Sequence, residues 1–371
     1  LTLFQPNVLN PNFEPIRMYI DKQNNKYFYD YNAAGTCGLF IYNDTTWRQV
    51  DYSSGQFASP YIRGLEIDDE GTVFTFSHWC LYCDYDKAPQ ISAWDSTSFN
   101  ETNLAETKLN NIRSILKDGN GNIYALGNYN VFKFINYSWV DISPPPNVMV
   151  PMYSDGAVID HNNNLLMIKY SSSIFAKYDG QNWSVINLPF IYPSQIKVDK
   201  YNNVWISGTN PTSGDKSLFK YNWSTFTRFD QSNSPIQSMW AMSFDIDNSG
   251  RVWFSERSST GPLQFNVCSY DGSTWTSYDS TSSPFIHYGV FETLPSGRIF
   301  YKMTSNYNPY QTDKYYEYDG SSLHYDSLLS SFWINGARHL EEDHEGNIWF
   351  DPGMDYGLFL LNDTGIIKSI T

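Results

Sequence analysis

The sequence predicts an all-β protein, a single β-propeller built from four-stranded antiparallel blades. Aromatic residues make up 18% of the chain and charged residues only 17%, a balance that suits the pleated, half-buried surface of strands. A phrase of the form Asp-x-x-Gly-Asn-x-Trp recurs, as in DGNGNIYA (118–125), DNSGRVWF (247–254) and DHEGNIWF (343–350). A second phrase follows it, as in YDGQNW (178–183) and YDGSTW (270–275).

The first phrase occurs eight times along the chain. Its copies open at residues 21, 68, 118, 160, 199, 247, 294 and 343, and the mean spacing of about 46 residues is that of one propeller blade. Because a single blade cannot bury both of its faces, blades stack around an axis. We therefore predict eight blades, with seven as the alternative count.

Each phrase has the chemistry of a hairpin turn. In the first, the Asp side chain can accept backbone N–H groups across a tight turn, and Gly or Asn supplies a residue with positive φ. The flanks alternate between apolar and polar residues, as in IRSILKD (112–118), which predicts a hairpin between the first and second strands of each blade. The Trp, Phe or Tyr after the turn is expected in the core between blades. The Asp-Gly of the second phrase predicts the second hairpin.

These elements define the expected domain organisation. Residues 1–15 lie outside the repeat and are expected to form a strap, and 16–371 form the propeller. The predicted blades are about 16–60, 61–110, 111–153, 154–192, 193–238, 239–285, 286–334 and 335–371.

The repeated phrase resembles a known family. Asp-x-x-Gly-Asn-x-Trp-Phe followed by Gly-Leu-Phe-x-Tyr-Asp-Gly is similar to the two-component regulator propeller repeat, found in extracytoplasmic sensor propellers of bacterial hybrid histidine kinases and in secreted bacterial proteins. More loosely, the repeat resembles the propeller of streptogramin B lyases. The resemblance covers nearly the whole chain after residue 15. It implies a bacterial protein that is secreted, displayed on the cell surface or periplasmic.

Composition excludes several partners. The net charge of −15 and pI near 4.7 argue against nucleic acid and anionic membranes, which require clustered Lys and Arg. No apolar run is long enough to span a membrane.

The chain begins at Leu1-Thr2 without an initiator Met, which is expected of an exported, processed protein. Cys80 and Cys83 have no second CxxC, so the four cysteines (Cys37, Cys80, Cys83 and Cys268) are expected to be free or to form one local disulfide.

A candidate binding site follows from the blade pattern. Counting back eight residues from the Gly or Asn of each turn reaches the start of the first strand, the end of the channel where propellers usually bind ligands. The polar residues predicted there are Arg63, Arg113, Asp155 and Arg338, and Trp240, His287 and Tyr288 lie in or beside the adjoining loops. Arginine forks beside aromatic rings suit an acidic sugar, a carboxylated peptide or another glycan. Alternatively, the arginines pair with acids of neighbouring blades, such as Glu66 or Glu342, and stiffen the ring.

No catalytic or metal-binding pattern stands out. The histidines show neither HxH nor HExxH spacing, so no catalytic residue, metal ligand or cofactor is assigned. We therefore expect a surface or secreted binding module for a glycan, peptide or protein partner, alone or within a larger surface assembly, and more readily than an enzyme. Two alternatives stay open: a metal-assisted lyase that uses His287 with Glu292 or His339 with Glu341, and the ligand-sensing propeller of a signalling receptor.

Overall fold

The protein is described by a computed structural model. The residues it describes are 15–30, 38–51, 62–77, 91–94, 99–102, 112–127, 130–145, 156–170, 173–236, 241–257, 265–278, 289–303, 314–331, 340–350, 358–362 and 365–370. They form eight four-stranded sheets in which every pair of neighbouring strands is antiparallel and consecutive in sequence. This is an all-β propeller fold with four-stranded blades, as the sequence predicts. In the described part of the chain, no helix has the length and apolar character to cross a membrane.

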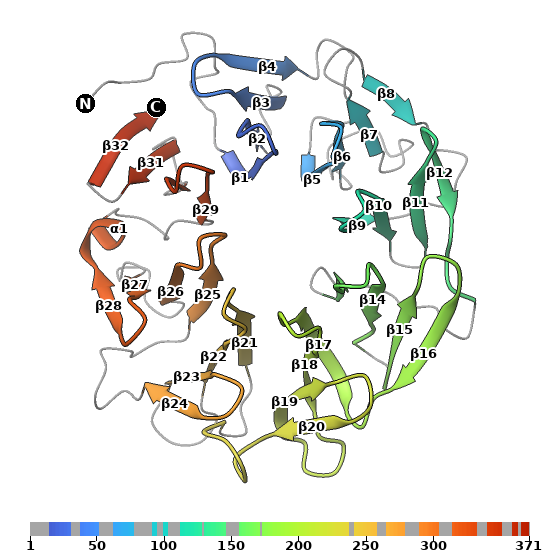
Figure 1. Ribbon diagram of the computed structural model, residues 1–371, viewed down its shortest axis with the longest axis vertical. Coiled ribbons are helices and arrows are strands. Elements are labelled where there is room, and N and C mark those ends of the chain that lie inside the picture. The colour runs from blue at the N-terminus through green and yellow to red at the C-terminus, as the bar shows by residue number, and fades with distance from the viewer. Residues whose placement is uncertain are drawn as a thin grey trace, which may run out of the picture. The chain divides into compact units, whose positions relative to one another are not determined.

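The chain divides into two compact units. The first contains 1–154, 179–183 and 338–371, and the second contains 155–178 and 184–337. Sheets are numbered in chain order, and most of their strands are labelled in Figure 1. The strands of sheets 1, 2, 3 and 8 are β1 (Pro15–Ile20), β2 (Lys26–Asp30), β3 (Gly38–Tyr42), β4 (Trp47–Asp51); β5 (Ile62–Ile67), β6 (Val73–Ser77), β7 (Ile91–Trp94), β8 (Phe99–Thr102); β9 (Ile112–Lys117), β10 (Ile123–Gly127), β11 (Val131–Ile135), β12 (Ser138–Asp141); and β29 (Leu340–Glu342), β30 (Ile348–Phe350), β31 (Leu358–Asn362), β32 (Gly365–Ile370).

Sheets 4 to 7 follow the same plan, with one short helix after the last strand of sheet 7. Their elements are β13 (Ala157–Ile159), β14 (Leu165–Ile168), β15 (Ile174–Tyr178), β16 (Trp183–Asn187); β17 (Ile191–Val198), β18 (Val204–Thr209), β19 (Lys216–Tyr221), β20 (Phe226–Phe229); β21 (Ala241–Ile246), β22 (Val252–Arg257), β23 (Phe265–Tyr270), β24 (Trp275–Tyr278); and β25 (Gly289–Thr293), β26 (Ile299–Met303), β27 (Lys314–Tyr318), β28 (Leu323–Asp326), α1 (Ser327–Ser331).

The prediction of one ring of eight equivalent blades is corrected. Each copy of the sequence repeat corresponds to one sheet, and eight sheets are described. The chain, however, forms two compact units rather than one. Described core clusters join sheets 8, 1, 2 and 3 in the first unit and sheets 4, 5, 6 and 7 in the second. A ring is defined by the interfaces between blades, which the repeat does not encode. The repeat therefore predicts the four-stranded sheets but not how they assemble.

The turns have the predicted conformation. The fourth residue of each copy of the first phrase has positive φ: Asn24, Gly71, Gly121, Asn163, Asn202, Gly250, Gly297 and Gly346. In the copy that opens at Asp199, Oδ1 accepts the backbone N–H groups of Tyr201 at 2.9 Å and Asn203 at 2.8 Å. The prediction that the Asp side chain closes a tight turn is confirmed.

The aromatic residue after the turn has a second role that the sequence did not reveal. The indole N–H of Trp205 donates to the Asp199 carboxylate at 2.9 Å. The pairs Trp253–Asp247 (2.9 Å), Trp349–Asp343 (2.8 Å), Tyr27–Asp21 (2.9 Å) and Tyr124–Asp118 (3.1 Å) repeat this contact. The carboxylate therefore connects the turn to the buried ring of the second strand, and the ring's position is fixed by a hydrogen bond as well as by packing.

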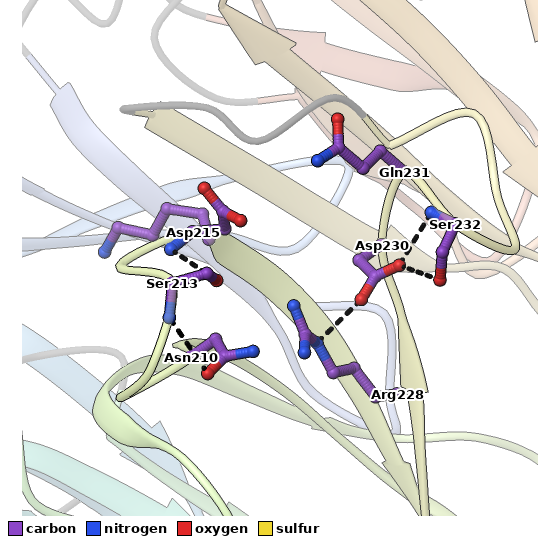
Figure 2. A pocket seen from close by; sticks show the side chains of 8 residues that line it. Asn210, Ser213, Asp215, Arg228, Asp230, Gln231 and Ser232 are labelled. Atoms are coloured by element: carbon purple, nitrogen blue, oxygen red, sulfur yellow. Dashed lines mark hydrogen bonds and ion pairs between the residues drawn. The ribbon is translucent and has the colours of Figure 1, made fainter.

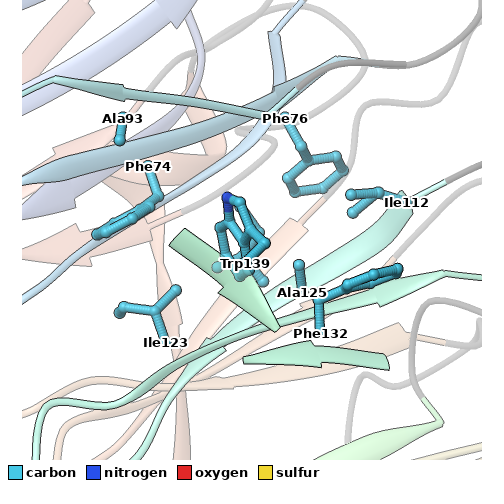
Figure 3. Close-up of a cluster of buried hydrophobic side chains, with 9 residues drawn as sticks. Phe74, Phe76, Ala93, Ile112, Ile123, Ala125, Phe132 and Trp139 are labelled. Carbon is cyan, nitrogen blue, oxygen red and sulfur yellow. The ribbon is translucent and has the colours of Figure 1, made fainter. Parts of the chain in front are cut away.

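The core lies between sheets, as predicted. Trp205 of sheet 5 packs with Phe244 and Phe254 of sheet 6. Figure 3 shows the corresponding cluster between sheets 2 and 3, where Phe74 and Phe76 face Ile112 and Phe132. Burial of such apolar area is the main driving force for packing one sheet against the next.

The strand bounds depart from the predicted domain bounds at two places. Pro15, assigned to the strap, already belongs to β1, and β17 begins at Ile191, two residues before the predicted start of its blade. The other strap residues lie outside the described part of the chain.

Candidate functional site

The predicted rim residues are only partly described. Arg63 lies in β5 and Arg113 in β9, where its side chain is half-buried. The other five fall outside the described residues: Asp155, Trp240, His287, Tyr288 and Arg338. The rim cluster therefore stays a prediction. The same holds for the lyase alternative, since His339 and His287 are not described either, and the described residues contain no group of three His, Cys, Asp or Glu side chains suited to a metal ion.

Polar side chains of the first strands connect neighbouring sheets. The Lys117 ammonium of β9 donates to the Ile67 carbonyl of β5 at 2.7 Å. The Glu66 carboxylate of β5 accepts the Ile67 N–H at 3.1 Å, and burial raises its pKa although the Lys117 charge acts against this. The described cation beside Glu66 is thus a lysine, where the sequence suggested an arginine.

Sheets 5 and 6 show the same kind of bridge in more detail. The Gln195 amide of β17 donates to the Phe244 carbonyl of β21 at 2.7 Å and accepts its N–H at 3.2 Å, so it imitates a strand pair. Lys197 forms an ion pair with Asp245 at 2.9 Å. These first-strand groups hold neighbouring sheets together, so their polar atoms serve packing.

A pocket lies at one end of sheet 5 (Figure 2). The loop 210–215 joins β18 to β19, and the segment from residue 230 follows β20. Because the strands are antiparallel, the loop 210–215 and the segment from residue 230 lie at the same end of sheet 5. This end is opposite to the 199–203 turn, and β17 starts there. This is the end of the blade at which the sequence placed the site, but the pocket lies toward the outer strands. Its volume is about 170 Å³, and its lining residues are Asn210, Ser213, Asp215, Lys216, Arg228, Asp230, Gln231 and Ser232.

One wall of the pocket is an ordered polar network. The Arg228 Nε contacts the Asp230 carboxylate at 2.9 Å and donates to the Ser217 hydroxyl at 3.1 Å. Asp230 also accepts the Ser232 hydroxyl at 2.6 Å and its N–H at 2.7 Å. These bonds from Ser232, together with the Arg228 charge, hold the pKa of Asp230 below its usual value although partial burial acts to raise it. Asp230 is therefore an anion that fixes the position of the guanidinium.

Lys216 differs from Arg228 in its surroundings. Its side chain is half-buried at the start of β19, and burial lowers its pKa. Among the described side chains, none forms a salt bridge with Lys216. A partly desolvated ammonium favours a ligand that brings a negative charge or several hydrogen-bond acceptors.

The sequence did not identify this pocket. Lys216 opens the strand KSLFKY, and nothing in these six residues marks its side chain as half-buried. Lys216 lines the pocket together with residues of the segments 210–215 and 230–232, and the approach of these segments is a tertiary feature without a local sequence signal. The Asn210 side chain accepts the Thr212 N–H at 2.8 Å, so the first loop contains a defined turn.

Two histidines and one cysteine among the described residues make structural contacts. The backbone N–H groups of His161 and His344 donate to Asn202 and Asn24 of the adjacent sheet, at 2.9 and 3.0 Å. Cys268 is buried, and its thiol contacts the Ser277 hydroxyl at 3.6 Å. Cys37, Cys80 and Cys83 lie outside the described residues.

Comparisons with known proteins show the fold. No family model matches the chain, and no curated protein matches it. Solved structures do: an inactive virginiamycin B lyase from Staphylococcus aureus with quinupristin has 12% identity and a TM-score of 0.50, with 88% of this chain and 95% of that chain covered. Dipeptidyl peptidase 4 from Porphyromonas gingivalis has 9% identity and a TM-score of 0.58, with 98% of this chain and 60% of that chain covered.

A third solved structure is also similar to this chain. It is the extracellular domain of a protein assigned as a hybrid two component system from B. thetaiotaomicron, with 13% identity and a TM-score of 0.38 over 96% of this chain and 57% of that chain. At these identities, similarity carries the fold and leaves activity open.

Proposed function

We propose that this chain is a binding module that holds an anionic group of a glycan, peptide or protein partner in the pocket of sheet 5. The observation that supports it is Lys216, a half-buried cation to which no described side chain brings a salt bridge. Burying a charge is costly unless it is paired, so a carboxylate that entered the pocket would compensate the ammonium. Arg228, held by Asp230, offers further donors beside it.

The location that goes with this proposal is outside the cytoplasm of a bacterium. Its support is the likeness of the repeated phrase to sensor and secreted propellers. A ligand-binding propeller of this kind would serve as a free surface module or as one part of a larger assembly.

The experiment is a glycan and peptide array probed with the full chain and with Lys216→Met. The matched control is Lys200→Met, which removes an exposed lysine at the opposite end of the same sheet. We expect the strongest acidic ligands to lose about tenfold or more in affinity with Lys216→Met and to keep it with Lys200→Met. Equal binding by all three proteins would contradict the proposal. The triple variant Arg63/Arg113/Arg338→Ala tests the predicted rim in the same assay.

A further inference from the structure

Two tyrosines form an exposed pair near the start of β17, the first strand of sheet 5. Tyr170 and Tyr192 are 46% and 43% exposed, although most large aromatic side chains of the described strands are buried. Their ring centroids are 5.4 Å apart and their planes are inclined by 36°. Tyr170 follows β14 of sheet 4, and Tyr192 lies near the start of β17 of sheet 5. The pair thus spans two adjacent sheets of one compact unit.

The backbone holds Tyr192 in an unusual conformation. Its φ is +51°, in the left-handed region that disfavours residues with a Cβ. Unlike the positive-φ residues of the hairpin turns, Tyr192 lies within a strand, at a register shift between Ile191 and Gln195. Phe190 and Pro193 on either side are buried. Two anchored neighbours therefore maintain a strained residue whose ring remains exposed, a pattern that is frequent at ligand sites.

The position of the Phe190 ring is fixed by packing. Its ring stacks on Phe219 with centroids 3.9 Å apart. It also lies against Gly208, where a Cβ would come within 2.2 Å of the ring. The glycine thus makes room for the anchor that precedes Tyr192.

The tyrosine pair and the pocket lie at the same end of the strands of sheet 5. Ile191 is paired with Thr209, and Thr209 is paired with Lys216. Since neighbouring strands lie about 4.8 Å apart, the start of β17 and Lys216 are separated by roughly 10 Å. This separation suits a ligand of two or more linked rings.

We propose that Tyr170 and Tyr192 form a stacking platform for a sugar ring of an acidic oligosaccharide whose carboxylate lies beside Lys216. The C–H groups on one face of a pyranose pack against the electron-rich faces of aromatic rings. The sugar hydroxyls meet polar groups at the pocket margin, among them the exposed amide of Gln231. The inference rests on the proposed function and adds the chemical class of the ligand.

The test measures affinity by calorimetry for four probes: a galacturonic acid trimer, a hyaluronan tetrasaccharide, the methyl-esterified galacturonic trimer and a glutamate hexapeptide. We expect at least one acidic sugar to bind and the ester and peptide to bind at least tenfold more weakly. Tyr170→Ala and Tyr192→Gly are each expected to weaken sugar binding about tenfold, and Tyr192→Phe to change it by about twofold or less.

The control is Tyr137→Gly. Tyr137 is also an exposed tyrosine with positive φ, at +60°, but it lies in the outer hairpin turn of sheet 3. Glycine relieves the same backbone strain at both positions. A loss of binding that occurs with Tyr192→Gly and not with Tyr137→Gly is therefore due to removal of the Tyr192 ring. If Tyr192→Gly lowers the unfolding temperature, the affinity of Tyr170→Ala for the acidic sugar decides whether the platform exists.

The outcomes separate the two proposals. Binding of the acidic sugar or of the peptide that requires Lys216 but is unchanged by Tyr170→Ala and Tyr192→Gly overturns the platform and leaves the proposed function standing. Absence of Lys216-dependent binding for every probe at millimolar concentration overturns both.

Discussion

At the residue scale, the most informative groups are half-buried ionisable side chains that packing alone does not explain. Lys216 and Glu66 are each kept partly from water. Burial lowers the pKa of Lys216 and raises the pKa of Glu66, and both shifts favour the neutral form. Glu66 sits in a first strand beside Lys117, so its burial serves the junction of sheets 2 and 3. Lys216 faces a pocket, which makes it a candidate for binding.

Glu66 gives a prediction about pH. Because its pKa is raised in the folded protein, the proton binds more tightly there than in the unfolded chain, so its stabilising contribution is present at pH 4 and lost as pH rises through the folded-state pKa. We expect Glu66→Gln to raise the unfolding temperature at pH 8 and to change it little at pH 4. Thermal unfolding followed by circular dichroism measures this.

The control for this prediction is Glu70→Gln, which changes an exposed carboxylate in the turn of the same sheet. We expect this variant to behave like the parent at both pH values. A stabilisation by Glu66→Gln that is equal at pH 4 and pH 8 would contradict the assignment of the effect to ionisation.

The sequence could not show which charged residues would be buried. Arg63 and Arg113 fall at the predicted start of a first strand, whereas nothing in the local sequence around Lys216 or Glu66 indicates burial. Nor does the tripeptide Ile-Tyr-Pro at 191–193 indicate that Tyr192 has positive φ. These properties arise from the approach of segments far apart in sequence.

At the element scale, the hairpin turn is the unit that the sequence describes best. The Asp accepts backbone N–H groups two and four residues on, and the fourth residue has positive φ, both of which follow from short-range chemistry. The Trp or Tyr six residues after the Asp adds a hydrogen bond from the buried second strand. That spacing is visible in the sequence, but core packing alone is enough to explain an aromatic residue there, so the spacing does not predict the hydrogen bond.

This turn predicts a large loss of stability for Asp199→Ala. The substitution leaves the Tyr201 and Asn203 N–H groups and the Trp205 indole without their shared acceptor, in a place where Asp199 is 2% exposed. We expect a loss of about 2–4 kcal/mol in the free energy of unfolding. Urea denaturation measures it.

Asp271→Ala is the comparison for this prediction. Asp271 accepts N–H groups in the exposed turn of the second phrase, without a buried aromatic donor. Its substitution is expected to cost clearly less. Similar losses for both would show that the indole bond and burial add little.

At the scale of the whole molecule, segments from the two ends of the sequence build one compact unit. Sheet 8 packs on sheet 1, and Trp349 lies 5.9 Å from both the Phe28 and Tyr42 rings. Lys26, fully buried, contacts Asp44 and lies 3.7 Å from Asp343. Contacts between such distant segments carry a high loop-closure cost, so formation of this interface is expected to be a late step in folding.

Trp349→Ala tests the importance of this interface. The change removes a ring that is 2% exposed and the donor to Asp343, and we expect a loss of about 3–5 kcal/mol together with increased binding of a hydrophobic dye. Trp223→Ala, at the half-buried outer turn of sheet 5, is the control and should cost less. Equal stability of Trp349→Ala and the parent would show that sheet 8 contributes little to the first unit.

The repeated indole–carboxylate contact also has a spectroscopic consequence. Trp205 and Trp253 in the second unit and Trp349 in the first occupy equivalent positions, each almost fully buried with its N–H on an aspartate. Their fluorescence should shift to longer wavelength when the local sheet opens to water. Difference spectra between the parent and single Trp→Phe variants would isolate each signal. The chain therefore contains native optical probes that can report the opening of each unit separately, without an attached dye.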